Sequence, residues 1–597
     1  MKRSLGIILV LLISSLASAE QVATPTFSPD GGEYTGTIFV RVFCATPLAK
    51  IYYTTDGSEP TQSSWRDWGS ITVQKSCTLK AKAFVVGMSP SETISAEFTI
   101  VTPTPSISPN GGPYAIPQGV KLHAEDSLIP IYYTLDGQEP TTASQSIPNN
   151  KRVVIDHSCI LKAAALRQGC EMSDVASAEF SFREPIIMHV RADGDNVNDG
   201  LSWGTAKKTV QNALYGLIPG DEVWVAAGQY PSVINLPIGV KLFGGFAGNE
   251  TEWAQRDLLA NPTVLDGSGV HRVITCGPGE GSPTVIDGLV LKNGGPNAIY
   301  AYRSFVTVRN CVITGNHGTT SIELYYSTRP FLIENNIIVG NEGHGIFSGS
   351  SYAGSGGTIA NNVFAYNSGT AINVGCVSRT IRNNIVFRNA IGVNNIICAS
   401  GGMATIAGNC VFANGLDYAY PNANPHPTDI DVDPLFRDMA NGDYRLMWDS
   451  PCIDAGTNEG APATDIEGRV RPMDGNHDGL AVADIGAYES PILARIDILQ
   501  DSIRLQPNKL IQVVILSDQI FSALQVDPSS VTFGPGNATE IHGKGHPQDI
   551  NSDGLTDLLF HFSCAESGIV PGYQTVFLQG KLKTGEDFIG WDNMTAR

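Results

Sequence analysis

The chain has 597 residues, 42% of them hydrophobic, with 63 Gly and 35 Pro, which indicates several turn-rich globular domains. Its formal net charge of −20 argues against nucleic acid as a partner, because such binding depends on Lys and Arg that neutralise phosphates. The same charge disfavours polyanionic glycans as partners unless a bound cation bridges the two.

The first residues have the organisation of a secretory signal. Lys2 and Arg3 precede an apolar segment at residues 5–16, and small residues at 17–19 form a cleavage site. We therefore expect residues 1–19 to be a signal peptide and the mature protein to be extracellular or at the cell surface. No later apolar run reaches the roughly 18 residues of a membrane-spanning helix, so the protein is not expected to span a membrane.

Eleven cysteines are present, and export permits disulfides between them. The plausible local pairs are Cys44 with Cys77 and Cys159 with Cys170. Spacings such as Cys-x-x-Cys are absent, so no zinc site is expected.

Residues 24–101 and 103–183 are two copies of one module. The first copy contains IYYTTDGSEPT at 51–61, and the second contains IYYTLDGQEPT at 131–141. In each copy a strand runs into an Asp-Gly turn, where glycine accepts a positive φ. Short alternating strands separated by turn residues predict a small β-sandwich for each copy.

This repeated phrase resembles the small β-sandwich domain at the C-terminus of chitobiases and β-hexosaminidases. The resemblance covers both copies of the module. It implies an accessory domain in a secreted, carbohydrate-associated protein, and the catalytic part of those enzymes has no counterpart in this sequence.

A short phrase recurs seven times between residues 264 and 415, in steps of 21 to 26 residues. A drifting period of this size, with short β-runs and no helical pattern, predicts a β-solenoid. Asparagine tolerates the left-handed backbone of a sharp corner, and stacked corners let its amides hydrogen-bond between coils. The residues expected to form corners in this way are Asn310, Asn335, Asn361 and Asn383, and likewise Asn316, Asn341, Asn367, Asn389 and Asn414.

Residues 186–495 hold this solenoid and its caps, and their later part contains DPLF at 433–436, SPCIDAG at 450–456 and DIGAYE at 484–489. These features resemble exported bacterial right-handed parallel β-helix proteins, which are similar in fold to pectate lyases, although that fold alone implies no activity. Residues 496–597 contain VDPSSVTFG at 526–534 and DINSDG at 549–554, and with these segments they resemble a small sandwich of secreted bacterial proteins. The expected fold class is therefore all-β, a right-handed single-stranded parallel β-helix flanked by small β-sandwich domains.

The second strand of each coil is expected to present one face to solvent. Side chains alternate between the two faces of a strand, and a slip of one residue would exchange the inward and outward sets. Aromatic rings on such a face pack against the C–H groups of sugars, while a tyrosine hydroxyl stays hydrated. The set expected to point inward is Ile299, Ile322, Ile346, Ile372 and Val393. The predicted carbohydrate-binding residues on the outward side are Tyr300, Tyr302, Tyr325, Phe347 and Asn373.

Catalysis on this face would need more charged groups than the strands supply. Glycoside hydrolysis uses two carboxylates about 5 to 9.5 Å apart, and Glu323 is the only carboxylate expected on the outward side. A lyase needs a base helped by cationic groups or a metal. An enzyme whose key residues lie in loops remains an alternative. The candidate catalytic residues are Glu323, Arg329 and His344.

Two acidic loops resemble calcium-binding loops. The first has Asp or Asn at positions 1, 3, 5 and 9 with glycine at position 6, but Phe560 at position 12 excludes an EF-hand proper. The second loop repeats the pattern in a shorter form, and either ion would be structural. The predicted calcium ligands are Asp549, Asn551, Asp553 and Asp557 in the first loop and Asp474, Asn476 and Asp478 in the second.

Three functions stay open from the sequence. The leading hypothesis is an exported or cell-surface protein that binds a polysaccharide or a cell-surface glycan along the aromatic groove. The second is a polysaccharide lyase or glycoside hydrolase that acts in the same groove. The third is a non-catalytic structural or adhesive surface protein in which the sandwiches are spacers.

Overall fold

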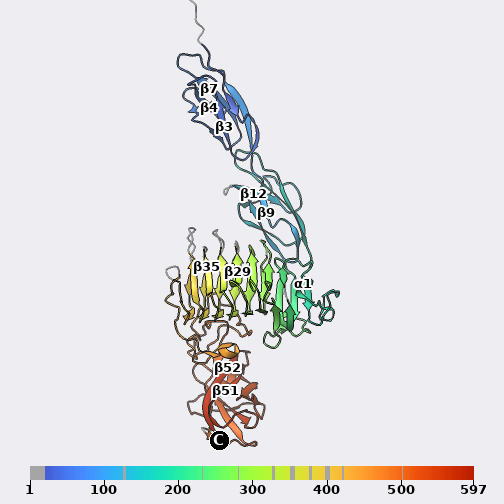
Figure 1. Ribbon diagram of the computed structural model, residues 1–597, viewed down its shortest axis with the longest axis vertical. Helices are drawn as coiled ribbons and strands as arrows, with labels where there is room; N and C mark the ends of the chain where they lie inside the picture. The colour runs from blue at the N-terminus through green and yellow to red at the C-terminus, as the bar shows by residue number, and fades with distance from the viewer. Residues whose placement is uncertain are drawn as a thin grey trace, which may run out of the picture. The chain divides into compact units, whose positions relative to one another are not determined.

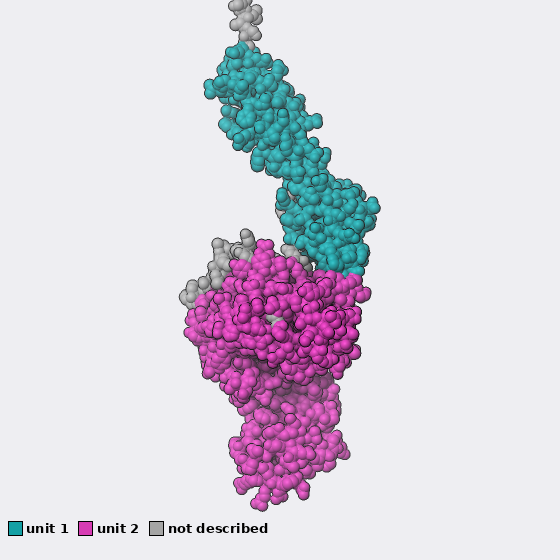
Figure 2. All heavy atoms as spheres, turned by 45° about the vertical axis from the view of Figure 1, so that its right-hand side comes forward, with its two compact units in different colours: residues 1–182 teal, residues 183–597 magenta. Residues whose placement is uncertain are grey.

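The computed structural model describes residues 20–597, apart from 126–128, 232, 280–281, 326–329, 350–355, 376–378, 397–403, 420–422 and 501. The expected signal peptide at 1–19 lies outside the described residues. The chain divides into two compact units, Met1–Phe182 and Arg183–Arg597, which Figure 2 distinguishes by colour. Regular structure is almost entirely β, and the single turn α1 (Val210–Ala213) is the one α-helix of the described residues. Short 3-10 turns are η1 (Trp203–Thr205), η2 (Trp253–Gln255), η3 (Met439–Asn441) and η4 (Ala523–Gln525).

The first unit contains two β-sandwiches built to one plan, a three-stranded sheet packed on a five-stranded sheet around an apolar core. The first sandwich pairs β1 (Thr26–Ser28), β3 (Ile38–Phe43) and β6 (Ile71–Val73) with β2 (Gly32–Thr35), β8 (Ile94–Val101), β7 (Cys77–Phe84), β4 (Lys50–Thr54) and β5 (Trp65–Arg66). The second pairs β14 (Arg152–Ile155), β11 (Gln118–His123) and β9 (Ser106–Ser108) with β10 (Gly112–Tyr114), β16 (Ala176–Phe182), β15 (Cys159–Ala165), β12 (Pro130–Thr134) and β13 (Gln145–Pro148).

The predicted disulfides of this unit are absent. Cys44, Cys77, Cys159 and Cys170 are all free cysteines. The Sγ of Cys44 lies 3.2 Å from the carbonyl oxygen of Ala23, and the Sγ of Cys170 lies 3.2 Å from that of Gln74. Both thiols therefore point at backbone acceptors, and the predicted pairing is wrong.

The second unit begins with a parallel β-helix, whose stacked coils are seen from the side in Figure 1. Three parallel sheets run through the coil stack. The first sheet is β17 (Ile187–Val190), β18 (Glu222–Ala226), β21 (Lys241–Phe246), β24 (Thr284–Asp287), β27 (Val306–Arg309), β30 (Leu332–Glu334), β33 (Thr358–Ala360), β36 (Thr380–Arg382) and β39 (Thr405–Ala407). The second sheet is β19 (Gly228–Pro231), β22 (Thr263–Asp266), β25 (Val290–Lys292), β28 (Val312–Thr314), β31 (Ile337–Val339), β34 (Val363–Ala365), β37 (Ile385–Phe387) and β40 (Cys410–Phe412). The third sheet is β20 (Ile234–Leu236), β23 (Ile274–Cys276), β26 (Ile299–Tyr302), β29 (Thr320–Tyr325), β32 (His344–Gly349), β35 (Thr370–Gly375) and β38 (Ile391–Ile396).

The corner between the first and second sheets is made by the predicted asparagines. Asn310, Asn335, Asn361 and Asn383 have φ of 52° to 53°, and Gly408 takes the same place in a later coil. Asparagine is one of the few residues besides glycine that adopt this left-handed backbone readily. This part of the prediction is confirmed.

A ladder of buried asparagines runs beside that corner. Its members follow the left-handed residues, and they are Asn336, Asn362, Asn384 and Asn409. The side-chain oxygens of Asn362, Asn384 and Asn409 each accept the backbone N–H and the side-chain N–H of the ladder residue one coil earlier, at 2.9–3.1 Å. The oxygen of Asn336, at the start of the ladder, accepts the backbone N–H of Cys311 at 3.0 Å. The ladder ends on Asp429, whose carboxylate accepts the same two groups of Asn409. Each buried amide thus has the partners that burial requires.

A second ladder corrects the prediction for the other set of asparagines. Asn316, Asn341, Asn367, Asn389 and Asn414 hydrogen-bond from coil to coil and end on Asp417. The left-handed backbone lies one residue earlier, at φ of 53° to 64°. The residues that adopt it are Gly315, Gly340, Tyr366, Arg388 and Ala413. These asparagines therefore stabilise the turn through their amides and not through their own backbone conformation.

The C-terminal signature segments, residues 433–489, pack against the outside of the coils and are named here the strap. Corner asparagines hold the strap through backbone carbonyls. The Nδ2 of Asn335 donates to Thr464 at 2.7 Å, and that of Asn383 donates to Thr457 at 2.9 Å. Apolar residues of the strap, including β41 (Phe436–Asp438) and β42 (Asp443–Leu446), cover the outer face of β31, β34 and β37. The strap therefore occupies the outer face of the second sheet.

The chain ends in a third sandwich with its own core. One sheet is β43 (Ile492–Leu493), β52 (Asp587–Ala596), β51 (Gly572–Leu582), β47 (Val526–Phe533) and β48 (Ala538–Thr539), with β45 (Ser502–Ile503) beside β52. The other sheet is β44 (Ile496–Ile498), β46 (Leu510–Ile515), β50 (Asp557–Ser563) and β49 (His546–Gln548).

Candidate functional site

The outward side chains of the third sheet form an unbroken ladder across seven coils, here called the outward ladder. Its members are Asn235, Thr275, Tyr300, Glu323, Phe347, Asn373 and Asn394. Their inward neighbours are 0% exposed, namely Ile299, Ile322, Ile346, Ile372 and Val393. The predicted register of these strands is therefore confirmed.

A second outward row lies beside this ladder. Tyr302 pairs with Tyr325, and Tyr325 pairs with Gly349. Gly349 has no side chain, and the ring of Phe347 occupies that space, because a Cβ added at Gly349 would lie 2.7 Å from the ring Cζ. The ring therefore lies over the glycine. Tyr300 and the three aromatic residues named here are all partly exposed on one face.

A polar network fixes the middle of this face. The guanidinium of Arg272 lies 3.9 Å from the ring centroid of Tyr300, and its Nε donates to the Oδ1 of Asn297 at 2.9 Å. The Nδ2 of Asn297 in turn donates to Glu323 at 3.1 Å. The sequence did not single out Arg272 and Asn297, because both lie outside the strands. The place of Asn297, two residues before the inward Ile299, is the one signal that could have indicated it. The network orients Glu323 and covers one face of the Tyr300 ring.

The candidate catalytic residues are not brought together. His344 pairs with Thr320, which places it about 10 Å further along the strands than Glu323. The Nδ1 of His344 accepts the backbone N–H of Thr370 at 2.9 Å, and burial lowers the pKa of this histidine. Arg329 lies outside the described residues. Among the described outward residues of the third sheet, Glu323 is the one carboxylate.

The first acidic loop is folded around its own backbone. Asp549 accepts the N–H of Gly554 at 3.1 Å, and Asp553 accepts that of Leu555 at 2.8 Å. Asn551 likewise accepts the N–H of Asp553 at 3.0 Å. These turns place the three side-chain oxygens along one loop. Asp557 is fully buried, and its two oxygens accept the N–H groups of residues 517 and 550, so it anchors the loop.

The second acidic loop gains a neighbour that the sequence did not indicate. Asp474 accepts the N–H groups of Asp478 and Gly479 at 3.1 and 2.9 Å, and Asn476 accepts that of Asp478 at 2.9 Å. Beside them Asp454 has a buried Oδ1 without a hydrogen-bond partner. Burial, and then the nearby charge of Asp474, raise the pKa of Asp454 to about 7. A cation bound here would give the Oδ1 of Asp454 a partner and would stabilise its ionised form, which lowers the raised pKa.

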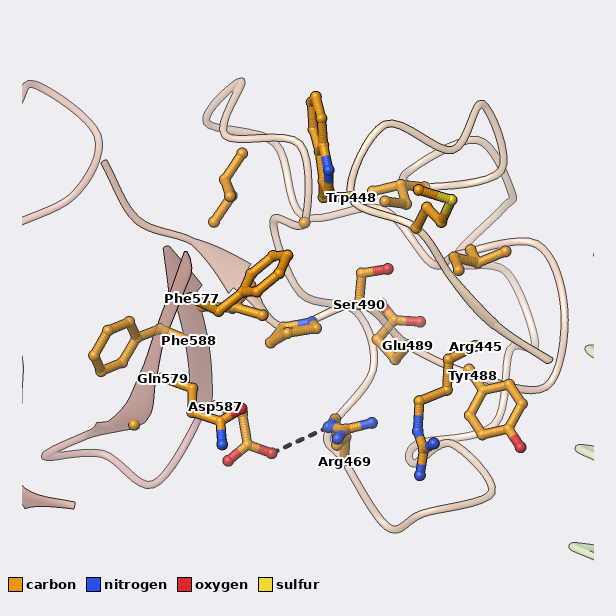
Figure 3. Close-up of a pocket in the computed structure, with 18 of the residues that line it drawn as sticks. Arg445, Trp448, Arg469, Tyr488, Glu489, Ser490, Phe577, Gln579, Asp587 and Phe588 are labelled. Atoms are coloured by element: carbon orange, nitrogen blue, oxygen red, sulfur yellow. Dashed lines mark hydrogen bonds and ion pairs between the residues drawn. The ribbon is translucent and has the colours of Figure 1, made fainter. Parts of the chain in front are cut away.

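A cavity of about 670 Å³ lies between the strap and the C-terminal sandwich (Figure 3). Its walls include Arg445, Trp448, Arg469, Tyr488, Phe577 and Asp587. Several of its charged groups are already in ion pairs, since Arg469 donates to Asp587 at 3.2 Å and Arg445 donates to Glu467, outside the cavity lining, at 2.9 Å. Such pairing is typical of a boundary between packed modules, so the outward ladder is the stronger candidate site.

Comparison with known families identifies two kinds of module. Residues 29–95 and 109–177 match the chitobiase/beta-hexosaminidase C-terminal domain, and residues 268–412 match the right handed beta helix region. The resemblances drawn from the sequence for the two N-terminal modules and for the β-helix are confirmed. The fold is all-β, with a right-handed parallel β-helix and small β domains at the N-terminus.

Three solved structures are similar to parts of the chain. Pectate lyase Pel9A is 14% identical over 51% of this chain and 96% of that chain, with a TM-score of 0.32. Murine CEACAM1b is 11% identical over 26% and 98%, with a TM-score of 0.14. Drosophila N-cadherin EC1-3 is 11% identical over 27% and 68%, with a TM-score of 0.11. These low scores leave the module assignments to the family matches.

A comparison with curated proteins gives no match. Within the part of the chain that the structure describes, no helix is both long and apolar enough to cross a membrane.

Proposed function

We propose that this protein is exported, remains extracellular or at the cell surface, and holds a polysaccharide along the outward face of the third sheet. The observation that carries the proposal is the outward ladder, which runs unbroken over seven coils. The β-helix fold is compatible with a polysaccharide-related function, and the family matched by the N-terminal modules is named after enzymes that act on glycans. The charged and apolar segments at residues 2–16 support export.

The chemistry of the face suits a sugar chain. Coils follow each other every ~4.8 Å, so an extended polymer meets one position of the outward ladder at regular intervals. The partly exposed rings of Tyr325 and Phe347 offer apolar surface for sugar C–H groups. Asn394, which is partly exposed, donates to the buried Asn373 at 3.1 Å, so its amide is held in place as a polar group for sugar hydroxyls. A sugar chain bound along several coils would gain its affinity from many individually weak contacts.

The same face favours holding a glycan over cutting it. A hydrolase needs a second carboxylate about 5 to 9.5 Å from the first, and Glu323 has none among the described outward residues of this sheet. Glu323 is itself engaged by Asn297. His344 uses one ring nitrogen to accept a backbone N–H. The described residues of this face therefore supply surface and hydrogen bonds but no acid–base pair.

Retention on a panel of immobilised glycans tests this function. The full-length secreted protein is run through native gels that contain neutral or acidic polysaccharides. We expect slowed migration in at least one neutral glycan gel, because the net charge of −20 disfavours acidic polymers. The retained glycan is then incubated with the protein and assayed for reducing ends and for ultraviolet-absorbing unsaturated products.

Each result of that experiment is decisive. Retention without products supports a binding protein. New reducing ends or unsaturated products would establish a hydrolase or lyase and replace the proposal. Normal migration in every gel would leave the structural surface protein as the better description.

Structural calcium is the second part of the proposal. The acidic loops around residues 474–478 and 549–553 carry side-chain oxygens at calcium-loop spacing, and Asp454 adds a carboxylate to the 474–478 loop. An ion bound only by the folded chain at about 100 times its Kd stabilises that chain by about 2.7 kcal/mol. Calcium would therefore raise the thermal transition of the protein.

Calorimetry with and without a chelator tests the ion. We expect EDTA to lower the Tm, and Ca²⁺ added to the EDTA-treated protein to restore the part of the loss that these two loops account for. The variants Asp474→Asn and Asp549→Asn should each lose part of that response, whereas the exposed control Glu566→Gln should keep all of it. A thermal transition that EDTA leaves unmoved rules out a structural calcium ion in both loops.

A further inference from the structure

Three histidines and one glutamate of the C-terminal sandwich converge on a single point. Glu540 and His542 lie in the segment between β48 and β49, His546 is the first residue of β49, and His561 lies in β50. One potential ligand atom from each of the four residues lies within 4.8 Å of all the others. The pairing of β49 with β50, and a bridge from Glu540 to Phe562, bring the two segments together. Sheet pairing thus fixes the cluster.

The three imidazole rings have the mutual geometry of ligands around one ion. Their centroids are 5.0, 5.2 and 5.3 Å apart, and the rings are inclined by 82° to 87°. Imidazoles that ligate one tetrahedral Zn²⁺ through nitrogens at about 2.0–2.1 Å have centroids about 5 Å apart. Histidines that only cover a surface patch have no physical reason to place their three ring planes nearly perpendicular to one another.

The nitrogen and oxygen atoms at the centre agree with this geometry. The Nδ1 of His542 lies 3.2 Å from the Nε2 of His546 and 3.0 Å from the Oε1 of Glu540. The same Oε1 lies 3.8 Å from the Nδ1 of His561 and 3.9 Å from the Nε2 of His546. Four ligand atoms on a tetrahedral zinc ion are separated by about 3.3 Å. If the longer separations of 3.8 and 3.9 Å shorten to about 3.3 Å, all four atoms lie at ligand distance from one ion.

The surrounding groups hold two of the ligands in place. The Oε2 of Glu540 accepts the backbone N–H of Lys544 at 3.2 Å and that of His542, which turns the Oε1 toward the rings. The glutamate side chain is only 1% exposed. The Nδ1 of His561 is buried and has no hydrogen-bond partner, although buried ring nitrogens normally have one. Its other nitrogen lies 3.2 Å from the amide of Gln512, a contact that orients the ring.

We propose that Glu540, His542, His546 and His561 bind one Zn²⁺ ion, which ties the segment between β48 and β49 to β50. Three imidazoles and a carboxylate suit zinc, whereas calcium takes oxygen ligands only. Four protein ligands leave no open position, so the ion is structural rather than catalytic. The site is separate from both acidic loops and from the outward ladder.

Zinc titration of the full-length protein tests the site. Protein stripped with EDTA is titrated with Zn²⁺ by calorimetry, and Co²⁺ is added in parallel because tetrahedral Co²⁺ absorbs strongly in the visible. We expect one Zn²⁺ per chain, a higher Tm with zinc, and a tetrahedral Co²⁺ spectrum. The variant His546→Ala should bind Zn²⁺ at least tenfold more weakly. The matched control His157→Ala removes an exposed histidine of the first unit and should bind as the wild type does.

Two results would overturn the site. One is a wild-type protein that binds no zinc, and the other is a His546→Ala variant with the wild-type affinity. Circular dichroism in EDTA establishes that the variant is folded. If His546→Ala does not fold, the same titrations are carried out with His542→Ala. A tetrahedral Co²⁺ spectrum that persists in His542→Ala would contradict the ligand set. Calcium in excess is not expected to displace the zinc.

Discussion

At the scale of single residues, Asn362 illustrates how the coils are held together. Its side-chain oxygen accepts two hydrogen bonds from Asn336, and its nitrogen donates to Asn384 and to two backbone carbonyls. The residue is fully buried, so its removal leaves several groups without either protein or water as a partner. Its contribution is therefore structural and large.

Replacing this asparagine should be costly. We expect Asn362→Ala to lower the free energy of unfolding by roughly 2–4 kcal/mol, because several buried polar groups lose their partners together. Denaturant unfolding of the full-length protein measures the change. The control Asn394→Ala removes an outward amide and should change stability by less than about 0.5 kcal/mol. Equal losses in the two variants would show that the ladder does not stabilise the coils.

Asp454 makes stability depend on pH. Burial, together with the charge of Asp474, raises its pKa to about 7, whereas an aspartate in an unfolded chain has a pKa of about 4. As pH rises from about 4 to 7, the unfolded chain ionises first and the folded state loses stability. In EDTA we expect the Tm of the strap region to fall by a few degrees between pH 5 and pH 8, with a smaller fall in Asp454→Asn.

Calorimetry at several pH values measures this effect. Added Ca²⁺ at pH 8 should restore most of the lost Tm, because a cation stabilises the ionised carboxylate. A pH dependence identical in the wild type and in Asp454→Asn would assign the effect to other carboxyl groups.

The sequence predicted corner asparagines but not which of two adjacent asparagines adopts the left-handed backbone and which forms the ladder. Asn335 and Asn336, like Asn361 and Asn362, are adjacent and chemically identical. One adopts the left-handed backbone and holds the strap, while the other forms the ladder. That difference depends on which side chain points into the coil, and no composition or spacing expresses it.

At the scale of elements, the third sheet was predictable because its inward positions are strongly aliphatic. Repeated isoleucines set the register, and the register set the outward row. The polar network of Arg272, Asn297 and Glu323 was not predictable, since it joins turns to strands across coils. The histidine cluster was missed for the same reason. His542 and His546 are four residues apart, but His561 reaches them only through the pairing of β49 with β50.

The packing of the Phe347 ring over Gly349 gives a prediction at the scale of elements. A methyl group at position 349 would lie 2.7 Å from the ring, so Gly349→Ala should lift the ring away from the sheet. We expect glycan retention to change severalfold while the Tm shifts by no more than about 2 °C, because the ring lies on the surface and is free to move. Native gels and calorimetry measure the two quantities. A large loss of Tm would mean that the glycine serves the backbone instead.

At the scale of the whole molecule, the chain combines modules with separate cores. Two sandwiches form the first unit, and the β-helix, strap and last sandwich form the second. The strap covers the outer face of the second sheet, so the function of the coils is to be sought on the remaining faces. Among them the described outward residues of the third sheet combine aromatic rings, amides and one carboxylate, Glu323. This distribution supports the proposed binding of a polymer.

The most direct test compares glycan affinity in variants of the aromatic face. Affinity gels of the retained polysaccharide are run with wild type, Phe347→Ala, Tyr325→Ala and the control Tyr215→Ala, which removes a tyrosine that is 72% exposed elsewhere in the same unit. We predict that each of the first two variants loses roughly tenfold in affinity, since burying one aromatic side chain contributes about 1.5–3 kcal/mol, and that the control is unchanged. Unaltered affinity in both Phe347→Ala and Tyr325→Ala would contradict binding along the third sheet.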